Sequence, residues 1–288
     1  MREFHVVIQA GIGPDFRTGA ADGCSANYCH FLFPAARYTA VVSDTLVINE
    51  IYLSLQGEST FAGLPCIFIR LTACDLRCSY CDSAYAFTEG KKTTLTEIRA
   101  KVHQVAAPFG NPPPAARHPP LPLVELTGGE PLLQKKSLPL MKQLCDDGFT
   151  VLLETSGAHD ISQVDPRVHR VMDLKCPASG EADRNRWENL KHLKRTDEIK
   201  FVIGTVEDYE WALRQIAEHR LNLLCPILFS WAHPLAPAQR EKSLKKVPAG
   251  HRPISQRELA ERIVADALPV RFQIQLHKVI WPAAQRGV

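Results

Sequence analysis

The sequence predicts an α/β fold, an incomplete (β/α) barrel of about six parallel strands. Two observations support it. Short apolar stretches typical of strands alternate with stretches typical of helices along most of the 288 residues, and such alternation indicates right-handed β-α units on a parallel sheet. The composition, 45% hydrophobic and 23% charged, suits one large globular domain with a sizeable core.

The first 42 residues have no sustained hydrophobic period and contain scattered glycines, including the run Gly11-Ile12-Gly13-Pro14. We expect residues 1–42 to be a poorly ordered extension and residues 43–288 to form a single domain. One hypothesis is that the native chain starts near Val41 or Val42, which mass spectrometry of the native N-terminus would test.

Two strands are expected next, at 46–55 and 66–72, separated by turn residues. The second strand alternates apolar residues with Phe68 and Arg70 on its other face. A guanidinium in an apolar strand is costly unless it is paired, and its shape suits a bidentate contact with a carboxylate. Arg70 is therefore a candidate ligand for a carboxylated molecule.

The later elements follow the same alternation. A helix at 96–107 precedes residues 108–122, which hold seven prolines and are expected to form an extended surface loop without chemistry. Further strands are predicted at 123–127, 150–154, 168–175, 198–203, 221–228 and 270–276, and further helices at 137–147, 185–194, 207–219 and 256–267.

A cluster of three cysteines follows the strand at 66–72. Cys74, Cys78 and Cys81 form a Cys-x3-Cys-x2-Cys array. Three soft thiolates at this spacing can hold one metal centre from one side, and a [4Fe-4S] cluster bound by only three cysteines keeps one iron open for another ligand. A structural zinc site would ordinarily need a second Cys or His arm, which the nearby sequence lacks.

Three more polar segments follow predicted strands: Gly128-Gly129-Glu130-Pro131, Thr155-Ser156-Gly157 and Asp173-Leu174-Lys175. The carboxyl ends of parallel strands meet at one edge of a sheet, where sites usually lie. We therefore expect these segments and the cysteines to share one site. The glycines allow close approach of a ligand to the backbone, and Glu130 can accept from an ammonium group.

The charge and the cysteine usage exclude several classes. A formal net charge of +3 is too small to indicate nucleic-acid binding, and the four tryptophans show no stacking pattern. Nine cysteines without a regular framework do not suggest a disulfide-rich secreted domain, and no apolar run is long enough to span a bilayer. We expect a soluble, cytoplasmic protein with no membrane partner.

The cysteine array, with Tyr80 before its third cysteine, together with Gly-Gly-Glu-Pro resembles the radical S-adenosylmethionine enzymes. The resemblance implies the barrel type of that superfamily, a [4Fe-4S] cluster on Cys74, Cys78 and Cys81, and S-adenosylmethionine as cofactor. The cofactor contacts that it implies are Tyr80, Cys81, Asp82, Gly129, Glu130, Ser156, Asp173, Leu174 and Lys175.

A narrower resemblance covers residues 49–288. Leu55-Gln56-Gly57-Glu58, Phe68-Ile69-Arg70, Thr127-Gly128-Gly129-Glu130-Pro131-Leu132, Glu154-Thr155-Ser156-Gly157 and the tail from Gln273 are similar to the 7-carboxy-7-deazaguanine synthases. That family converts 6-carboxy-5,6,7,8-tetrahydropterin to 7-carboxy-7-deazaguanine with loss of ammonia, on the route to queuosine, through a 5′-deoxyadenosyl radical. The implied substrate contacts are Leu55, Gln56, Gly57, Arg70 and Thr127.

The resemblance also implies Mg²⁺, an electron donor such as a flavodoxin or ferredoxin, and a homodimer. The family usually binds Mg²⁺ through a threonine after the Cys-Asp pair, where this sequence has Ser83. Serine keeps the oxygen that a hard cation prefers but lacks the methyl group that restricts the rotamer. His277 could be either a structural histidine in a strand or a substrate contact, and the sequence does not distinguish the two.

Two alternatives remain at this stage. An enzyme of the same superfamily that activates a protein glycyl radical would need a groove for its protein substrate, whereas Arg70 and the segment 55–58 favour a small carboxylated ligand. A non-catalytic zinc-binding module would be colourless after anaerobic reconstitution, whereas an iron–sulfur protein absorbs near 400 nm.

Overall fold

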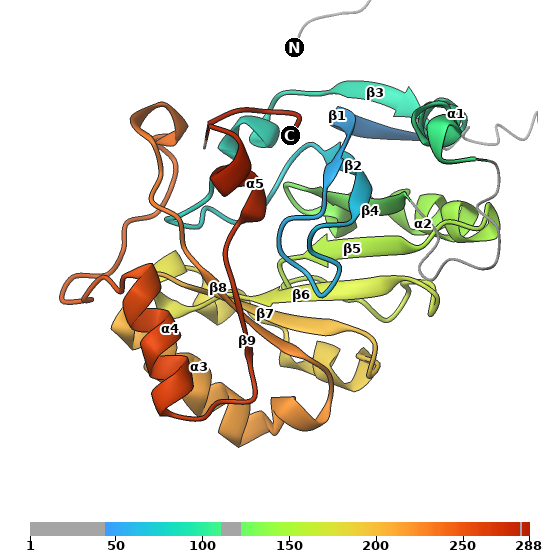
Figure 1. Ribbon diagram of the computed structural model, residues 1–288. Helices are drawn as coiled ribbons and strands as arrows, with labels where there is room; N and C mark the ends of the chain where they lie inside the picture. The colour runs from blue at the N-terminus through green and yellow to red at the C-terminus, as the bar shows by residue number, and fades with distance from the viewer. Residues whose placement is uncertain (1–43, 111–121, 283) are drawn as a thin grey trace, which may run out of the picture. The chain divides into compact units, whose positions relative to one another are not determined.

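One mixed sheet organises the protein (Figure 1). The computed structural model describes residues 44–110, 122–282 and 284–288, and within them nine strands follow the order β3-β1-β2-β4-β5-β6-β7-β8-β9. The strands are β1 (Thr45–Leu55), β2 (Pro65–Leu71), β3 (Lys91–Thr94), β4 (Leu123–Gly128), β5 (Val151–Thr155), β6 (His169–Leu174), β7 (Glu198–Ile203), β8 (Ile227–Trp231) and β9 (Arg271–Gln273). The predicted extension and residues 111–121 of the predicted Pro-rich loop lie outside these residues.

The sheet is an incomplete barrel, as predicted. Strands β2 and β4 to β9 are parallel, whereas β1 is antiparallel to both β2 and β3. The edge strands β3 and β9 do not pair with each other among the described residues. The parallel part thus has seven strands rather than about six.

Five α-helices are found in the described residues: α1 (Leu95–Ala106), α2 (Ser137–Asp146), α3 (Val206–His219), α4 (Gln256–Ala265) and α5 (Leu276–Ile280). The first and third begin with capping boxes, in which Thr94 and Thr205 exchange hydrogen bonds with Glu97 and Asp208. Among the described residues, no helix combines the length and the apolar composition that a membrane span requires.

Several predicted elements need correction. Residues 221–228 are not one strand, because a 3₁₀ turn occupies Leu221–Leu223 and β8 starts at Ile227. The predicted strand 270–276 ends at Gln273, before α5 starts at Leu276, and the predicted helix 185–194 is a 3₁₀ helix over Trp187–His192. Short apolar runs fit a strand or a helical turn equally well, so periodicity could not separate them.

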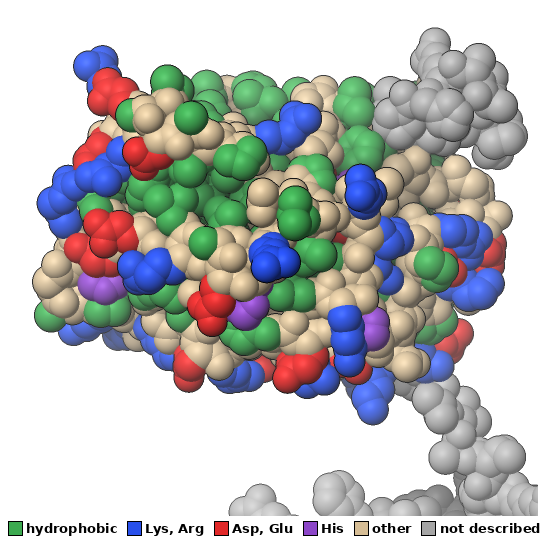
Figure 2. Space-filling view, turned by 90° about the horizontal axis from the view of Figure 1, so that it is seen from below, with side chains coloured by type: hydrophobic (Ala, Val, Ile, Leu, Met, Phe, Trp, Pro, Cys, Tyr) green, Lys and Arg blue, Asp and Glu red, His purple; other side chains and the backbone are tan. Residues whose placement is uncertain are grey.

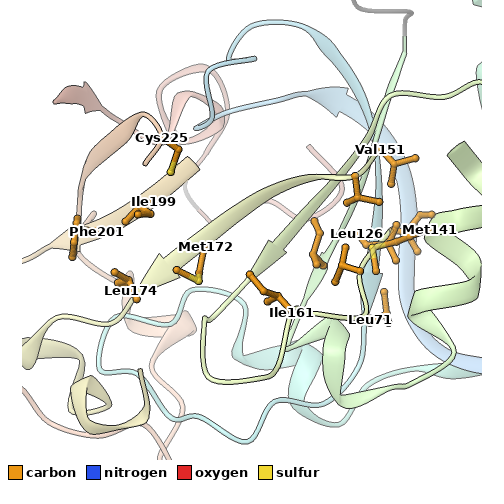
Figure 3. Packing of buried hydrophobic residues seen from close by; sticks show 14 of the residues in the cluster. Leu71, Leu126, Met141, Val151, Ile161, Met172, Leu174, Ile199, Phe201 and Cys225 are labelled. Atoms are coloured by element: carbon orange, nitrogen blue, oxygen red, sulfur yellow. The ribbon is translucent and has the colours of Figure 1, made fainter. Parts of the chain in front are cut away.

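The two faces of each parallel strand differ in chemistry. One face packs against the helices in the main hydrophobic core, where Leu71, Leu126 and Met172 lie among buried neighbours (Figure 3). The alternate residues of the same strands face the inside of the barrel, and many of them are charged. Because side chains alternate along a strand, each strand separates an apolar layer from a polar interior.

A small apolar cluster lies inside the barrel. Cys66, Leu123 and Leu152 are fully buried, and Phe61, Leu64 and Phe68 pack against them. These three buried residues come from the amino-terminal halves of β2, β4 and β5, so the cluster closes the barrel below the level of the strand ends. The exterior differs: the face in Figure 2 mixes basic and acidic side chains with apolar ones.

Candidate active site

A cavity of about 640 Å³ opens at the carboxyl ends of the parallel strands. Its lining includes most of the predicted site residues: Leu55, Gln56, Gly57, Arg70, Cys74, Cys78, Tyr80, Cys81, Asp82, Ser83, Thr127, Gly129, Ser156, Asp173 and Lys175. Glu130 and Leu174 do not line it. Leu174 is fully buried in the core on the helix side of β6, because it alternates with Asp173 and Lys175.

The cysteine loop starts from a left-handed residue. Ala73 has φ of +77°, which turns the chain away from β2 so that Cys74 follows at the cavity wall. Cys78 is buried, and Cys74 and Cys81 are half-buried. Burial raises the pKa of Cys74 to about 11 and that of Cys78 to about 12, so a metal must displace their protons to bind at neutral pH.

No group of three His, Cys, Asp or Glu side chains in the described residues converges on a single metal ion. The three cysteines line one cavity wall instead. An iron–sulfur cluster binds each thiolate on a different iron, so its ligands need not meet at one point. Three cysteines on one cavity wall are compatible with such a cluster.

The Gly-Gly-Glu segment supports the cysteine loop. The amide of Gly129 donates to Leu71 O at 3.0 Å, and the amide of Glu130 donates to Ala73 O at 2.8 Å. A Cβ on Gly129 would collide with the carbonyl of Ala73. The second glycine is therefore required by contact with the chain itself, and it also lines the cavity, where the approach of a ligand to its backbone stays a prediction.

Glu130 lies behind the cavity wall. Its carboxylate is fully buried and accepts hydrogen bonds from Thr155 Oγ1 at 2.9 Å, from Ser156 N and Oγ at 2.7 Å, and from Leu132 N at 3.0 Å. Glu130 is not among the residues that line the cavity, and these bonds fix its carboxylate beside Ser156. Glu130 holds Ser156, which does line the cavity, in place.

Two buried polar atoms beside the cysteines have no partner among the described residues: Tyr80 Oη and Asp173 Oδ1. The other oxygen of Asp173 accepts from Lys175 Nζ at 2.7 Å. Burial disfavours the lysine ammonium, but Asp173 outweighs it and raises the pKa of Lys175. Unpartnered buried polar atoms are rare, and here both belong to residues that line the cavity.

Arg70 is already paired. Its Nε donates to Glu50 Oε1 at 2.8 Å and one terminal nitrogen donates to Tyr52 Oη at 2.9 Å. Tyr85 Oη also donates to Glu50, at 2.9 Å. The remaining terminal nitrogen, Nη1, has no hydrogen-bond partner in the described structure, so Arg70 can still donate to a carboxylate in the cavity.

Gln56 is held on both sides of its amide. Its Oε1 accepts from Glu58 N at 2.6 Å and from Ser59 N at 3.1 Å, while its Nε2 donates to Glu125 at 2.6 Å. The side chain is 3% exposed. Gln56 therefore fixes the loop after β1 and positions Glu125.

The prediction missed a ring of charged residues deep in the cavity. Lys200 pairs with Glu154 and lies 3.6 Å from Glu58, which accepts from Ser230 at 2.7 Å. Glu125 forms no ion pair among the described residues, and burial together with Glu154 raises its pKa to about 8 although Lys200 acts in the opposite direction. The sequence contains a pattern that could have predicted these residues, because Glu125, Glu154 and Lys200 are charged positions within otherwise apolar strands.

The C-terminal segment completes the wall beside Asp82 and Ser83. Lys278 Nζ lies 2.5 Å from Asp82 Oδ2, and Gln275 Nε2 donates to the same oxygen at 3.3 Å. Burial raises the pKa of Asp82, but Lys278 more than offsets this and brings it to about 2. Ser83 lies at the cavity with its Oγ 4.0 Å from Cys81 Sγ.

His277 also lines the cavity, with its pKa lowered by burial. Its Nδ1 would lie 2.8 Å from a Cβ on Gly57. Arg286, which the prediction also missed, stacks over Tyr85 at 3.8 Å from the ring centre and pairs with Glu89 at 2.8 Å. The tail thus closes the side of the cavity next to β1 and β2.

Comparisons with known proteins decide the family. No family model matches the chain. The 7-carboxy-7-deazaguanine synthase of Koribacter versatilis is 44% identical over 243 residues, which cover 84% of this chain and 99% of that protein. The enzyme of the same name from Chlorobaculum tepidum is 40% identical and is covered to 97%. The chain belongs to the 7-carboxy-7-deazaguanine synthase family.

This family is part of the radical S-adenosylmethionine enzymes, as the cysteine array predicted. The fold agrees. The crystal structure of QueE from Escherichia coli matches with a TM-score of 0.57 at 24% identity and covers 81% of this chain and 95% of that one. Radical S-adenosylmethionine enzymes use a [4Fe-4S] cluster and S-adenosylmethionine, and the three cysteines with the unpartnered atoms of Tyr80 and Asp173 suit these groups.

Proposed function

We propose that the protein converts 6-carboxy-5,6,7,8-tetrahydropterin to 7-carboxy-7-deazaguanine and ammonia. The observation that carries this proposal is that the cysteine loop and the implied substrate contacts from β1, β2 and β4 line one cavity. The reaction balances without another reactant, because the product and ammonia together contain every atom of the substrate.

The cluster and S-adenosylmethionine, when bound, would supply the radical that removes a hydrogen atom from the substrate. Cys74, Cys78 and Cys81 would hold the cluster. The residues proposed to hold S-adenosylmethionine are those lining the adjoining wall: Tyr80, Asp82, Gly129, Ser156, Asp173 and Lys175. Glu130 would act through Ser156 rather than by contact.

The substrate would lie over the deep ring of charges. Arg70 Nη1 would donate to the substrate carboxylate, and Leu55, Gly57 and Thr127 would contact the ring system. Arg70 pairs with Thr127 across β2 and β4, and Phe68 pairs with Glu125 two residues deeper. Those two residues span about 6.6 Å along a strand, which is comparable with the long dimension of a fused two-ring heterocycle.

We further propose Mg²⁺ at Ser83, an electron donor such as a flavodoxin or ferredoxin, a homodimer, and a cytoplasmic location. Ser83 lines the cavity beside Asp82. A hydroxyl oxygen suits Mg²⁺, which usually takes one or two protein ligands together with oxygens from water and substrate.

The test is anaerobic incubation of the reconstituted protein with S-adenosylmethionine, a reductant and the carboxytetrahydropterin. We expect 7-carboxy-7-deazaguanine and ammonia in equal amounts. Cleavage of S-adenosylmethionine with full cluster loading but without the deazaguanine would contradict the substrate and leave the cofactor assignment standing.

A further inference from the structure

The loop that carries the cysteines is held from outside by a segment distant in sequence. Residues 236–246 lie between β8 and α4, and Lys245 N donates to Arg77 O at 2.8 Å. Arg77 lies between Cys74 and Cys78. In Figure 1 this orange segment leaves the barrel on the side of the blue-green loop that follows β2, in agreement with that bond.

Glu181 joins the two segments. Its Oε1 accepts from Arg77 N at 2.7 Å, and its Oε2 lies 2.9 Å from Lys245 Nζ. The same lysine nitrogen donates to Gly180 O at 2.5 Å. The Glu181 side chain is 4% exposed, so both of its oxygens are used in a nearly dry position. Both backbone polar groups of Arg77 are thus bonded to this pair of residues.

The contact is tightly packed as well as polar. A Cβ on Gly180 would lie 2.8 Å from Lys245 Cδ, so only glycine leaves room for the lysine stem. The loop 176–181 also bonds Ser79, whose amide donates to Ser179 O at 3.0 Å and whose hydroxyl donates to Ala178 O at 2.6 Å. The cysteine loop is therefore fixed on both sides of Cys78.

The same segment reaches the cavity. Gln239, Arg240 and Glu241 line it, a few residues before Lys245. A displacement of Lys245 would thus act both on the cavity wall and on the backbone between two cysteines.

We propose that Glu181 and Lys245 are positioning residues that hold the cysteine loop in the conformation that binds the cluster. The inference rests on the proposed function only in taking these cysteines as the cluster ligands. Neither residue lines the cavity, so neither is expected to touch substrate or cofactor. Weakening the Glu181 carboxylate loosens the amide of Arg77, and removing the Lys245 ammonium takes away the cation that fixes Glu181. The backbone bond from Lys245 N to Arg77 O remains in both cases, so the spacing between Cys74 and Cys78 varies through the Glu181 side.

The first experiment measures hydrogen–deuterium exchange of the cluster-free protein. In Lys245→Ala and Glu181→Gln we expect faster exchange confined to residues 74–81 and 176–181, because the Glu181 carboxylate that accepts from Arg77 N is weakened or no longer held by Lys245. Lys246→Ala is the matched control, since Lys246 is exposed and adjacent. Unchanged exchange in residues 74–81, or faster exchange throughout the barrel, would overturn the positioning role.

The second experiment follows iron loss from the reconstituted protein to a chelator. We expect iron loss to be about threefold faster in Lys245→Ala, because the Lys245 side chain is half exposed and its ion pair with Glu181 is partly screened by water. We expect iron loss to be about tenfold faster in Glu181→Gln, because this change weakens both bonds of a buried carboxylate. Lys245→Arg should restore slow loss. Equal rates in Lys245→Ala and Lys246→Ala would contradict the proposal.

The two proposals fail separately. If the wild-type protein takes up no cluster, the proposed function fails, while the exchange experiment still decides whether Glu181 and Lys245 fix the loop. If the cluster forms but the exchange pattern is unchanged, only the positioning role fails.

Discussion

Two neighbouring residues of β4 show how the outer and inner faces of the barrel differ. Leu126 points into the core between sheet and helices and is fully buried among apolar side chains (Figure 3). Glu125 points into the barrel, where Gln56 holds it and where, in the described part of the chain, it forms no ion pair. The first position stabilises the fold, whereas the second places a costly charge where a ligand can use it.

The ion-paired side chains on the interior face neutralise one another, so a single substitution there leaves the remaining charges unpaired. Lys200 is the cation between Glu58 and Glu154, and its side chain is 3% exposed. On the outer face each apolar side chain contributes separately. Substitutions on the two faces should therefore differ in kind as well as in size.

The largest effect is expected for Lys200→Met. It leaves the two half-buried carboxylates of Glu58 and Glu154 without their buried cation, which should reduce the free energy of unfolding by about 4 kcal/mol. Urea denaturation at pH 7 measures this. The double variant Lys200→Met with Glu154→Gln should recover part of the loss, and a single variant that loses less than about 1 kcal/mol would show that the ring does not act as a unit.

The next effect is expected for Leu126→Ala on the outer face. Loss of a buried leucine side chain should reduce the free energy of unfolding by about 3 kcal/mol, through lost burial and the cavity left behind. The affinity for 6-carboxypterin, an oxidised analogue of the proposed substrate, should change less than twofold. Fluorescence titration checks the affinity, and a large loss of binding would mean that the two faces are coupled.

The outer face is also the part that the sequence could predict. Alternating apolar residues such as Ile67, Ile69 and Leu71 indicated the strand, and the cysteine array and Gly-Gly-Glu located the site edge. Glu125, Glu154 and Lys200 interrupt apolar strands, so their pairing depends on which strands become neighbours. Local periodicity contains no such information.

Glu50 and Glu181 show the same limit. Arg70 was expected to need a carboxylate partner, and the structure supplies it from β1, the neighbouring antiparallel strand. The contact from Glu181 to Arg77 joins residues 104 positions apart. Such contacts follow from tertiary packing, which a single sequence does not reveal.

A smaller and pH-dependent effect is expected for Glu125→Gln. Burial raises the folded pKa of Glu125 from 4.5 to about 8. The protonated carboxyl is therefore favoured by folding, and its contribution to the free energy of unfolding is fully present below pH 4.5 and is lost as the pH rises through about 8. The glutamine cannot ionise. Relative to the variant, the wild type should lose roughly 1–3 kcal/mol of stability between pH 5 and pH 8.

Urea denaturation at several pH values measures that difference. Glu218→Gln, an exposed position on α3, is the matched control and should leave the pH dependence unchanged. Parallel curves for the wild type and Glu125→Gln would contradict the raised pKa. A weaker affinity of Glu125→Gln for 6-carboxypterin would add that the carboxyl contacts the ligand.

The smallest effect is expected at Ser83, on the loop that borders the inner face rather than on a strand. Its hydroxyl is not fixed by a strand, and its Oγ lies 4.0 Å from Cys81 Sγ. Ser83→Thr adds the methyl group that restricts the rotamer, so the Mg²⁺ concentration for half-maximal activity should fall about twofold to fivefold. Ser83→Ala removes the oxygen and should raise that concentration at least tenfold. Because neither change alters a strand contact, the free energy of unfolding should stay within about 0.5 kcal/mol of the wild type. If the wild type and the two variants require the same Mg²⁺ concentration, Ser83 is not a ligand of the metal.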